Sequence, residues 1–149
     1  MIEHQQILTD VFQTAREMRR LTSQYWQDLG RWLDVPFYVY YRFVCFLPYK
    51  ADPEQVETIS RPMYTLREDY SPRDCDDKAV LCACWFKGHG VPVRFIGVST
   101  QENKELNHVF LQLENGLDID ATYGEFAKYI GFYPYYPQVT HRENLTELF

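Results

Sequence analysis

The chain has 149 residues, which suits one domain with its own hydrophobic core, and its 46% apolar and 24% charged content is typical of globular proteins. A net charge of −6 argues against nucleic acid as a partner, because that binding depends on clustered Lys and Arg. No apolar run approaches the length of a membrane span, and the first residues lack the pattern of a secretory signal. We therefore expect a cytoplasmic protein without membrane contact, whose four cysteines remain free thiols.

The first third of the chain predicts helices. Apolar side chains recur at helical spacing from residue 7 to residue 33, which indicates one amphipathic helix or two in line. Thr22 and Ser23 could cap a second helix, and Gly30 could end it. Residues 1–34 are therefore expected to form a helical cover on the core. Residues 37–47 are apolar enough for a strand or a buried helix, and their periodicity does not decide between the two.

The middle of the chain predicts a buried helix after an irregular approach. Residues 53–59 indicate a short helix that begins with Pro53, and residues 62–73 indicate an irregular lead-in with two prolines. Residues 74–90 predict a helix covered on almost every side, since all eight residues from 79 to 86 are apolar. Acids at positions 74, 76 and 77 suit the N-terminal end of its dipole, and Gly88 or Gly90 with Pro92 provides the stop.

The second half of the chain predicts antiparallel β-structure. Residues 91–98 indicate a strand, with Pro92 at its start or at an edge, and residues 99–106 indicate a loop. Residues 108–113 and 117–122 form the clearest hairpin, around a turn at residues 114–116. The aromatic tail, residues 125–149, is expected to wrap the surface or to contact a protein partner. The predicted fold class is α+β, with the central helix packed on an antiparallel sheet.

Three residues on these elements fit thiol chemistry. A cysteine at the start of a helix, with a histidine and an acid on neighbouring strands, can form a thiolate, orient an imidazole and return a proton to a leaving group. Cys75, His108 and Asp120 occupy these positions. A cysteine in the first turn also feels the positive end of the helix dipole, although the three neighbouring carboxylates oppose the formation of a thiolate.

The length of the hairpin turn decides whether His108 can meet Asp120. With a two-residue turn, Asp120 points to the face opposite His108. With a three-residue turn that places Gly116 in the left-handed conformation, Leu113 faces Leu117 and Asp120 becomes the diagonal neighbour of His108, within side-chain reach. The sequence therefore favours Asp120 as the partner of His108, provided that the turn is the longer one.

Four short motifs follow one another within residues 55–124: Arg-Asp-Cys-Asp-Asp at 73–77, Gly-Val-Pro-Val-Arg at 90–94, His-Val-Phe at 108–110 and Ile-Asp-Ala-Thr at 119–122. In order and spacing they resemble the transglutaminase-like cysteine protease superfamily of bacteria and phages. Its usual motifs are Gly-Asp-Cys-Asp-Asp, Gly-Ile-Pro-Ala-Arg, a His followed by apolar residues, and Asp-Pro-Thr. The lead-in at 59–62 and 65–66 is also similar to these members. Arg73 stands where the family usually has Gly, and Ala121 where it usually has Pro.

The resemblance implies a papain-like catalytic core at residues 55–124 of a single domain spanning residues 1–149. In that core Cys75 is the nucleophile, His108 is the general base and acid, and Asp120 orients His108. Supporting residues are Arg73, Asp74, Asp76 and Asp77. The implied reaction passes through a thioester to hydrolysis of a peptide or protein substrate, or to transfer onto an amine, without a cofactor or metal.

An oxyanion hole would need a second donor besides the backbone N–H of Cys75. Tyr40 and Tyr49 are the candidates for this donor.

Two alternatives compete with this interpretation. A metal site is disfavoured, because Cys82 and Cys84 lie about 200° apart around a helix, and Cys75 and Cys82 are separated by roughly 10 Å along it. Cys45, Cys82 and Cys84 are expected to be buried packing residues, and His89 an exposed residue at the helix end. The other alternative is a catalytically silent copy of the fold that acts as a structural or interaction module through its tyrosine-rich tail.

Overall fold

The computed structural model describes residues 6–8, 10–48, 57–67, 74–99, 105–122, 139 and 141–149, and these form an α+β fold. The helical elements are α1 (Val11–Tyr25), the 3₁₀ stretch η1 (Trp26–Asp34), α2 (Phe37–Phe46), α3 (Pro62–Thr65) and α4 (Cys75–Gly88). The strands are β1 (Gln6–Leu8), β2 (Glu57–Ile59), β3 (Val93–Ser99), β4 (His108–Leu113), β5 (Asp118–Ile119) and β6 (His141–Asn144). Among the described helices, none is both long and apolar enough to cross a lipid bilayer.

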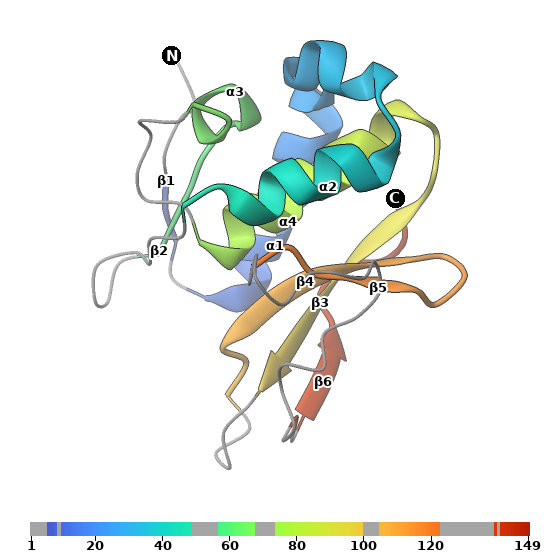
Figure 1. The fold of residues 1–149 in the computed structure, drawn as a ribbon. Helices are drawn as coiled ribbons and strands as arrows, with labels where there is room; N and C mark the ends of the chain where they lie inside the picture. Colours follow the sequence, from blue (N-terminus) through green and yellow to red (C-terminus); the bar gives the residue numbers. More distant parts are fainter. Residues whose placement is uncertain are drawn as a thin grey trace.

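Helix α4 occupies the centre of the molecule. It packs against α1, α2, α3 and η1 and also against strands β3 and β4 (Figure 1). All of its side chains from Asp76 to Cys84 are buried. The prediction of a helix covered on almost every side is therefore confirmed. Its end at His89 and Gly90, where Gly90 adopts a φ of +71°, also agrees with the predicted stop.

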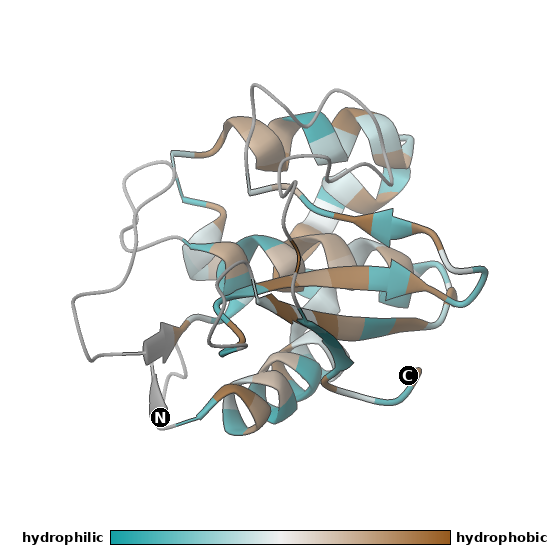
Figure 2. Cartoon of the chain, turned by 90° about the horizontal axis from the view of Figure 1, so that it is seen from below, coloured by the Kyte–Doolittle hydropathy of each residue, from teal (hydrophilic) through white to brown (hydrophobic). Residues whose placement is uncertain are grey.

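Four strands form an antiparallel sheet in the order β5-β4-β3-β6. One face of the sheet joins the main core through side chains such as Phe95 and Leu111. The other face carries a small apolar cluster of Ile96, Val98 and Phe110. Apolar residues dominate β3 and β4, whereas the four residues of β6 are polar and exposed (Figure 2).

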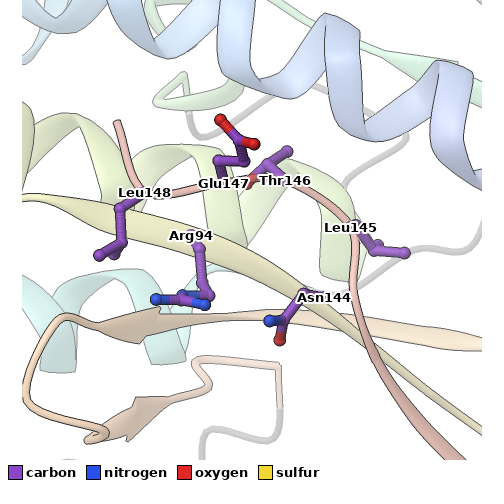
Figure 3. Close-up of a pocket in the computed structure, with 6 residues that line it drawn as sticks. All are labelled: Arg94, Asn144, Leu145, Thr146, Glu147 and Leu148. Carbon is purple, nitrogen blue, oxygen red and sulfur yellow. The ribbon is translucent and has the colours of Figure 1, made fainter.

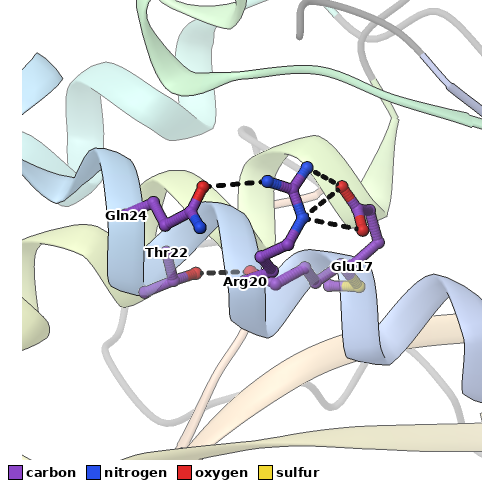
Figure 4. Close-up of polar contacts among 5 residues, drawn as sticks. Glu17, Arg20, Thr22 and Gln24 are labelled. Carbon is purple, nitrogen blue, oxygen red and sulfur yellow. Dashed lines mark hydrogen bonds and ion pairs between the residues drawn. The ribbon is translucent and has the colours of Figure 1, made fainter.

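The N-terminal region differs in part from the sequence prediction. Helix α1 begins at the N-cap Asp10, whose side chain accepts a hydrogen bond from the backbone N–H of Gln13 at 2.8 Å. The predicted cap at Thr22 is wrong, because Thr22 lies inside α1 and donates to the carbonyl of Met18 at 2.8 Å. The helical region continues after α1 as the 3₁₀ stretch η1, which is interrupted at Gly30, where φ is +55°. On the outer face of α1, Arg20 bonds Glu17 and Gln24 (Figure 4).

Residues 37–47, which the sequence left open between strand and helix, form helix α2. Its buried residues are Tyr40, Tyr41, Val44 and Cys45, a spacing that only a helix places on one face. Its outer side leaves Tyr38 and Phe46 exposed.

Three short elements correct the sequence prediction. Residues 57–59 form strand β2 rather than a helix end, because they pair antiparallel with β1 in the register Gln6↔Ile59. Residues 6–8 are accordingly a strand at the start of the predicted helical cover. Pro62 begins helix α3 within the predicted irregular lead-in, a position where its missing N–H costs nothing. The rest of the predicted helix at 53–56 lies outside the described residues.

The chain end adds a strand that the sequence did not predict. Strand β6 pairs with the edge of β3, and Leu145 and Phe149 continue the contact by donating to the carbonyls of Phe95 and Val93, each at 2.9 Å. The predicted aromatic tail at 125–149 therefore ends in an edge strand. Residues 125–138 and residue 140, on which the prediction of a partner surface chiefly rests, lie outside the described residues.

Candidate active site

The first turn of α4 is built by reciprocal carboxylate bonds. Asp74 is the N-cap and accepts hydrogen bonds from the N–H groups of Asp76 and Asp77, at 3.1 and 3.4 Å. Asp77 accepts in return from the N–H of Asp74 at 3.1 Å and from the N–H of Ser60 at 3.2 Å. This capping box satisfies the free donors of the helix end and fixes the segment before α3 to it. Two of the predicted supporting acids thus hold the backbone around Cys75.

Cys75 lies in this first turn and is partly buried. Its thiol donates to a carboxylate oxygen of Asp76 at 3.8 Å, and the backbone N–H of Val109 in β4 bonds its sulfur. Burial, followed by the charges of Asp76 and Asp74, raises the pKa of the thiol well above its usual value, while the Val109 N–H acts in the opposite direction. The resting form at neutral pH is therefore a protonated thiol placed next to the start of β4.

The hairpin closes through the three-residue turn, the longer of the two turns that the sequence allowed. Gly116 adopts a φ of +92°, and the N–H of Leu113 donates to the carbonyl of Leu117 at 2.9 Å. The ladder continues in the same register with Leu111 opposite Ile119. This register is confirmed, and it places Asp120 on the same face of the hairpin as His108.

His108 and Asp120 form a direct buried pair. The Nε2 atom of His108 lies 2.6 Å from Oδ2 of Asp120, and both side chains are about 95% buried. The second carboxylate oxygen, Oδ1, accepts from the backbone N–H of Thr122 at 2.9 Å. Burial opposes ionisation of Asp120, but His108 and the bonds from Thr122 outweigh it and hold the pKa of Asp120 below its usual value of 3.8. Asp120 is therefore a carboxylate that fixes the orientation of the imidazole.

Two buried residues that the sequence analysis did not assign support this pair. Lys78 is 1% exposed, and its Nζ donates to the carbonyls of Cys45 at 3.1 Å and of Ala121 at 3.3 Å. The hydroxyl of Tyr41 donates to the carbonyl of Asp120. The signal for Lys78 was a charged residue immediately before eight apolar ones on a buried helix, since buried lysines are rare unless they are paired.

Other predicted residues have different outcomes. The proposed role of Tyr40 as an oxyanion donor is wrong, because its fully buried hydroxyl donates to the carbonyl of Leu81 at 3.0 Å, inside the contact between α2 and α4. Tyr49 and Arg73 lie outside the described residues. His89 is exposed as predicted, stacks on Trp85, and has its Nε2 2.7 Å from the carbonyl of Leu33.

The remaining cysteines are packing residues. Cys45, Cys82 and Cys84 are free and at most 3% exposed, which confirms the prediction. Burial raises the pKa of all three, that of Cys45 to about 11. Within the described parts of the chain, no three His, Cys, Asp or Glu side chains gather in a way that could hold a metal ion.

A pocket of about 490 Å³ lies elsewhere, at the edge of the sheet (Figure 3). It is lined by Arg94 of β3 and by residues 144–148, and Cys75, His108 and Asp120 are not among its lining residues. The Nε atom of Arg94 is buried there without a hydrogen-bond partner.

No protein-family model, curated protein or solved structure matches this chain. The structure itself describes an α+β protein with a cysteine at the start of a buried helix and a histidine–aspartate pair on the adjacent hairpin.

Proposed function

We propose that the protein is a thiol-dependent acyl-transfer enzyme of the transglutaminase-like class, with a papain-like core, which hydrolyses an amide or related acyl bond in a peptide or protein. The observation that carries the proposal is the 2.6 Å contact between His108 and Asp120. His108 lies on β4, the strand that also supplies a backbone donor to Cys75. Four free cysteines favour a reducing compartment, so we place the activity in the cytoplasm.

The contact between His108 and Asp120 supports one route for the protons of the proposed reaction. Because Nε2 of His108 is bound to Asp120, Nδ1 is the ring nitrogen that would exchange a proton with Cys75. Nδ1 takes the thiol proton as the sulfur attacks the acyl carbon, and the same proton passes to the leaving amine when the thioester forms. Water then attacks the thioester, gives a proton to His108 and releases the acid together with the regenerated thiol. Asp120 stabilises the imidazolium in both steps.

The raised pKa of Cys75 constrains this mechanism. A protonated resting thiol requires His108 to remove the proton during the attack, so the enzyme does not depend on a preformed thiolate. The backbone N–H of Cys75 at the start of α4 is the proposed first donor to the oxyanion, where the helix dipole also favours negative charge.

The proposal is tested by labelling the folded protein with an acylating, activity-based electrophile. We expect one label on Cys75 in the wild type, none in Cys75→Ser, and an unchanged rate in the matched control Cys84→Ser, which alters a buried thiol at the other end of α4. Labelling that survives in Cys75→Ser would contradict the proposal. Peptide libraries, with and without amine acceptors, supplied to the unlabelled enzyme then distinguish hydrolysis from transfer.

A catalytically silent module is the second candidate, and the raised pKa of Cys75 favours it. Iodoacetamide separates the two at neutral pH. An enzyme should be alkylated at Cys75 well before Cys45, Cys82 or Cys84, and His108→Ala should slow the reaction. In a silent module the greater exposure of Cys75 alone sets its rate, so His108→Ala should leave the labelling of Cys75 at the wild-type rate while the protein stays folded.

A further inference from the structure

We infer that Lys78, on helix α4, is a positioning residue of the proposed active site. Its ammonium group binds the carbonyl of Ala121 and so prevents that carbonyl from pairing with β4 at the end of the β4–β5 ladder, beside Cys75. The inference rests on the proposed function, because it concerns the hairpin that carries the His108–Asp120 pair and the backbone donor to the proposed nucleophile Cys75. It concerns a residue that the reaction itself does not use.

The hairpin register shows where the ladder is interrupted. In an antiparallel pair, hydrogen-bonded positions recur every two residues along each strand. The bond from Leu113 to Leu117 fixes that series, so the next hydrogen-bonded pairs would be 111 with 119 and 109 with 121. Strand β5 nevertheless ends at Ile119, one such pair before Ala121.

Helix α4 supplies the partners at that last position. The carbonyl of Ala121, which would accept the N–H of Val109 in a continued ladder, accepts Nζ of Lys78 at 3.3 Å. The N–H of Val109 bonds the sulfur of Cys75 instead. Cys75 and Lys78 are three residues apart, so they lie on the same face of α4 and enter the gap together.

The interruption of the ladder at Ala121 lies next to the proposed catalytic pair of His108 and Asp120. Asp120 precedes the carbonyl that Lys78 holds, and its side chain crosses the hairpin diagonally to reach His108 at 2.6 Å. Lys78 makes a second bond, to the carbonyl of Cys45 in α2 at 3.1 Å, which also ties the ammonium group to that helix. Lys78 is 1% exposed, so water does not compete with the carbonyls for its ammonium group. Closing the last pair would return the N–H of Val109 to the ladder and take it from the sulfur.

The test compares Lys78→Met with the matched control Tyr40→Phe. Tyr40→Phe also removes a buried hydrogen bond between α2 and α4, but it touches neither the hairpin nor Cys75. Two readouts are taken on folded protein: the pH profile of iodoacetamide alkylation at Cys75, and the NMR resonance of the proton between His108 and Asp120. For Lys78→Met we expect the alkylation midpoint to rise by about one pH unit, with about tenfold slower labelling at pH 7, and a shifted or lost His108 resonance.

Tyr40→Phe should lower the unfolding midpoint and leave both readouts at their wild-type values. A folded Lys78→Met protein with a wild-type profile and resonance would overturn the inference. Should Lys78→Met not fold, the scalar coupling across the hydrogen bond from Nζ of Lys78 to the Ala121 carbonyl carbon is measured in the wild type. Its presence supports the inference, and a coupling from the Val109 N–H to that carbonyl in its place overturns it.

The NMR readouts require no turnover, so the inference and the proposed function fail separately. A wild-type protein that forms no acyl adduct at Cys75 contradicts the proposed function, whatever Lys78→Met does to the His108 resonance. If the wild type is reactive but Lys78→Met changes neither the His108 resonance nor the pH profile of Cys75, only the positioning role is contradicted.

Discussion

The two halves of helix α4 are buried to the same degree and have opposite chemistry. From Asp76 to Lys78 the buried side chains are charged, and Asp77 and Lys78 are each 1% exposed. From Ala79 onward the buried side chains are apolar or thiols, with Leu81 and Ala83 fully buried. One helix thus contains a packing segment and a polar segment in direct succession.

The difference separates what stabilises the fold from what arranges the site. Apolar burial contributes roughly 25 cal/mol per Å² removed from water, and its exact partners matter little. Buried charges are costly to desolvate and persist only with specific partners. In the polar half those partners include the backbone groups of Ser60 and Ala121, which belong to segments distant in the sequence. The polar half therefore fixes geometry through bonds that also stabilise the fold, whereas the apolar half contributes stability without specific polar partners.

The largest expected effect is on the reaction rate of Cys75, at the polar end of α4. His108→Ala should slow formation of the acyl adduct at Cys75 by about 10²–10⁴-fold, because it removes the proposed general base. The second-order rate constant with an activity-based electrophile measures the change. His89→Ala, at the exposed C-terminal end of the same helix, is the matched control and should leave the rate at the wild-type value. Equal rates for both variants would remove the functional distinction between the two ends.

The apolar half should respond in stability alone. Leu81→Ala should lower the free energy of unfolding by about 2–5 kcal/mol, because it opens a cavity at a fully buried position. Urea denaturation measures this loss, with the exposed Leu117→Ala as a control expected within about 0.5 kcal/mol of the wild type. A changed pH profile of Cys75 in folded Leu81→Ala would show that packing and site geometry are not separable here.

The N-terminal cap of α4 should contribute more to the free energy of unfolding than the N-terminal cap of α1. Asp77→Ala leaves the N–H groups of Asp74 and Ser60 without this acceptor in a buried place, so about 2 kcal/mol of stability should be lost. Asp10→Ala removes an exposed cap from α1 and should cost about 1 kcal/mol. Chemical denaturation of both variants measures the two losses. A smaller loss for Asp77→Ala would argue that the buried carboxylates are dispensable to the fold.

The smallest effect concerns acid stability. The pKa of Asp120 is lowered in the folded state, so its ionisation contributes stability that is fully present above its usual value of 3.8 and is lost as pH falls through the folded-state pKa. The stability difference between wild type and Asp120→Asn should therefore shrink on acidification below that value. Denaturation curves at a series of acidic pH values test the sign, and a difference that grows toward low pH would contradict it.

The sequence could predict elements whose evidence is local. Eight consecutive apolar residues indicated the buried helix α4, and alternation around Glu-Asn-Gly indicated the hairpin, with the register of the longer turn as one of two possibilities. That register was enough to predict the approach of Asp120 to His108, because side-chain direction alternates strictly along a strand.

The sequence alone determined the helix and the hairpin, and it gave Asp120 as the partner of His108 for the longer of two possible turns, since each of these depends on neighbours within a few positions. Only the tertiary structure decided the pairing of β1 with β2, the edge strand β6, the helical state of α2 and the partners of Lys78. Those features depend on backbone groups from distant segments, such as the carbonyl of Ala121 that Lys78 reaches. No periodicity in the chain encodes which distant carbonyl a buried ammonium group will bind.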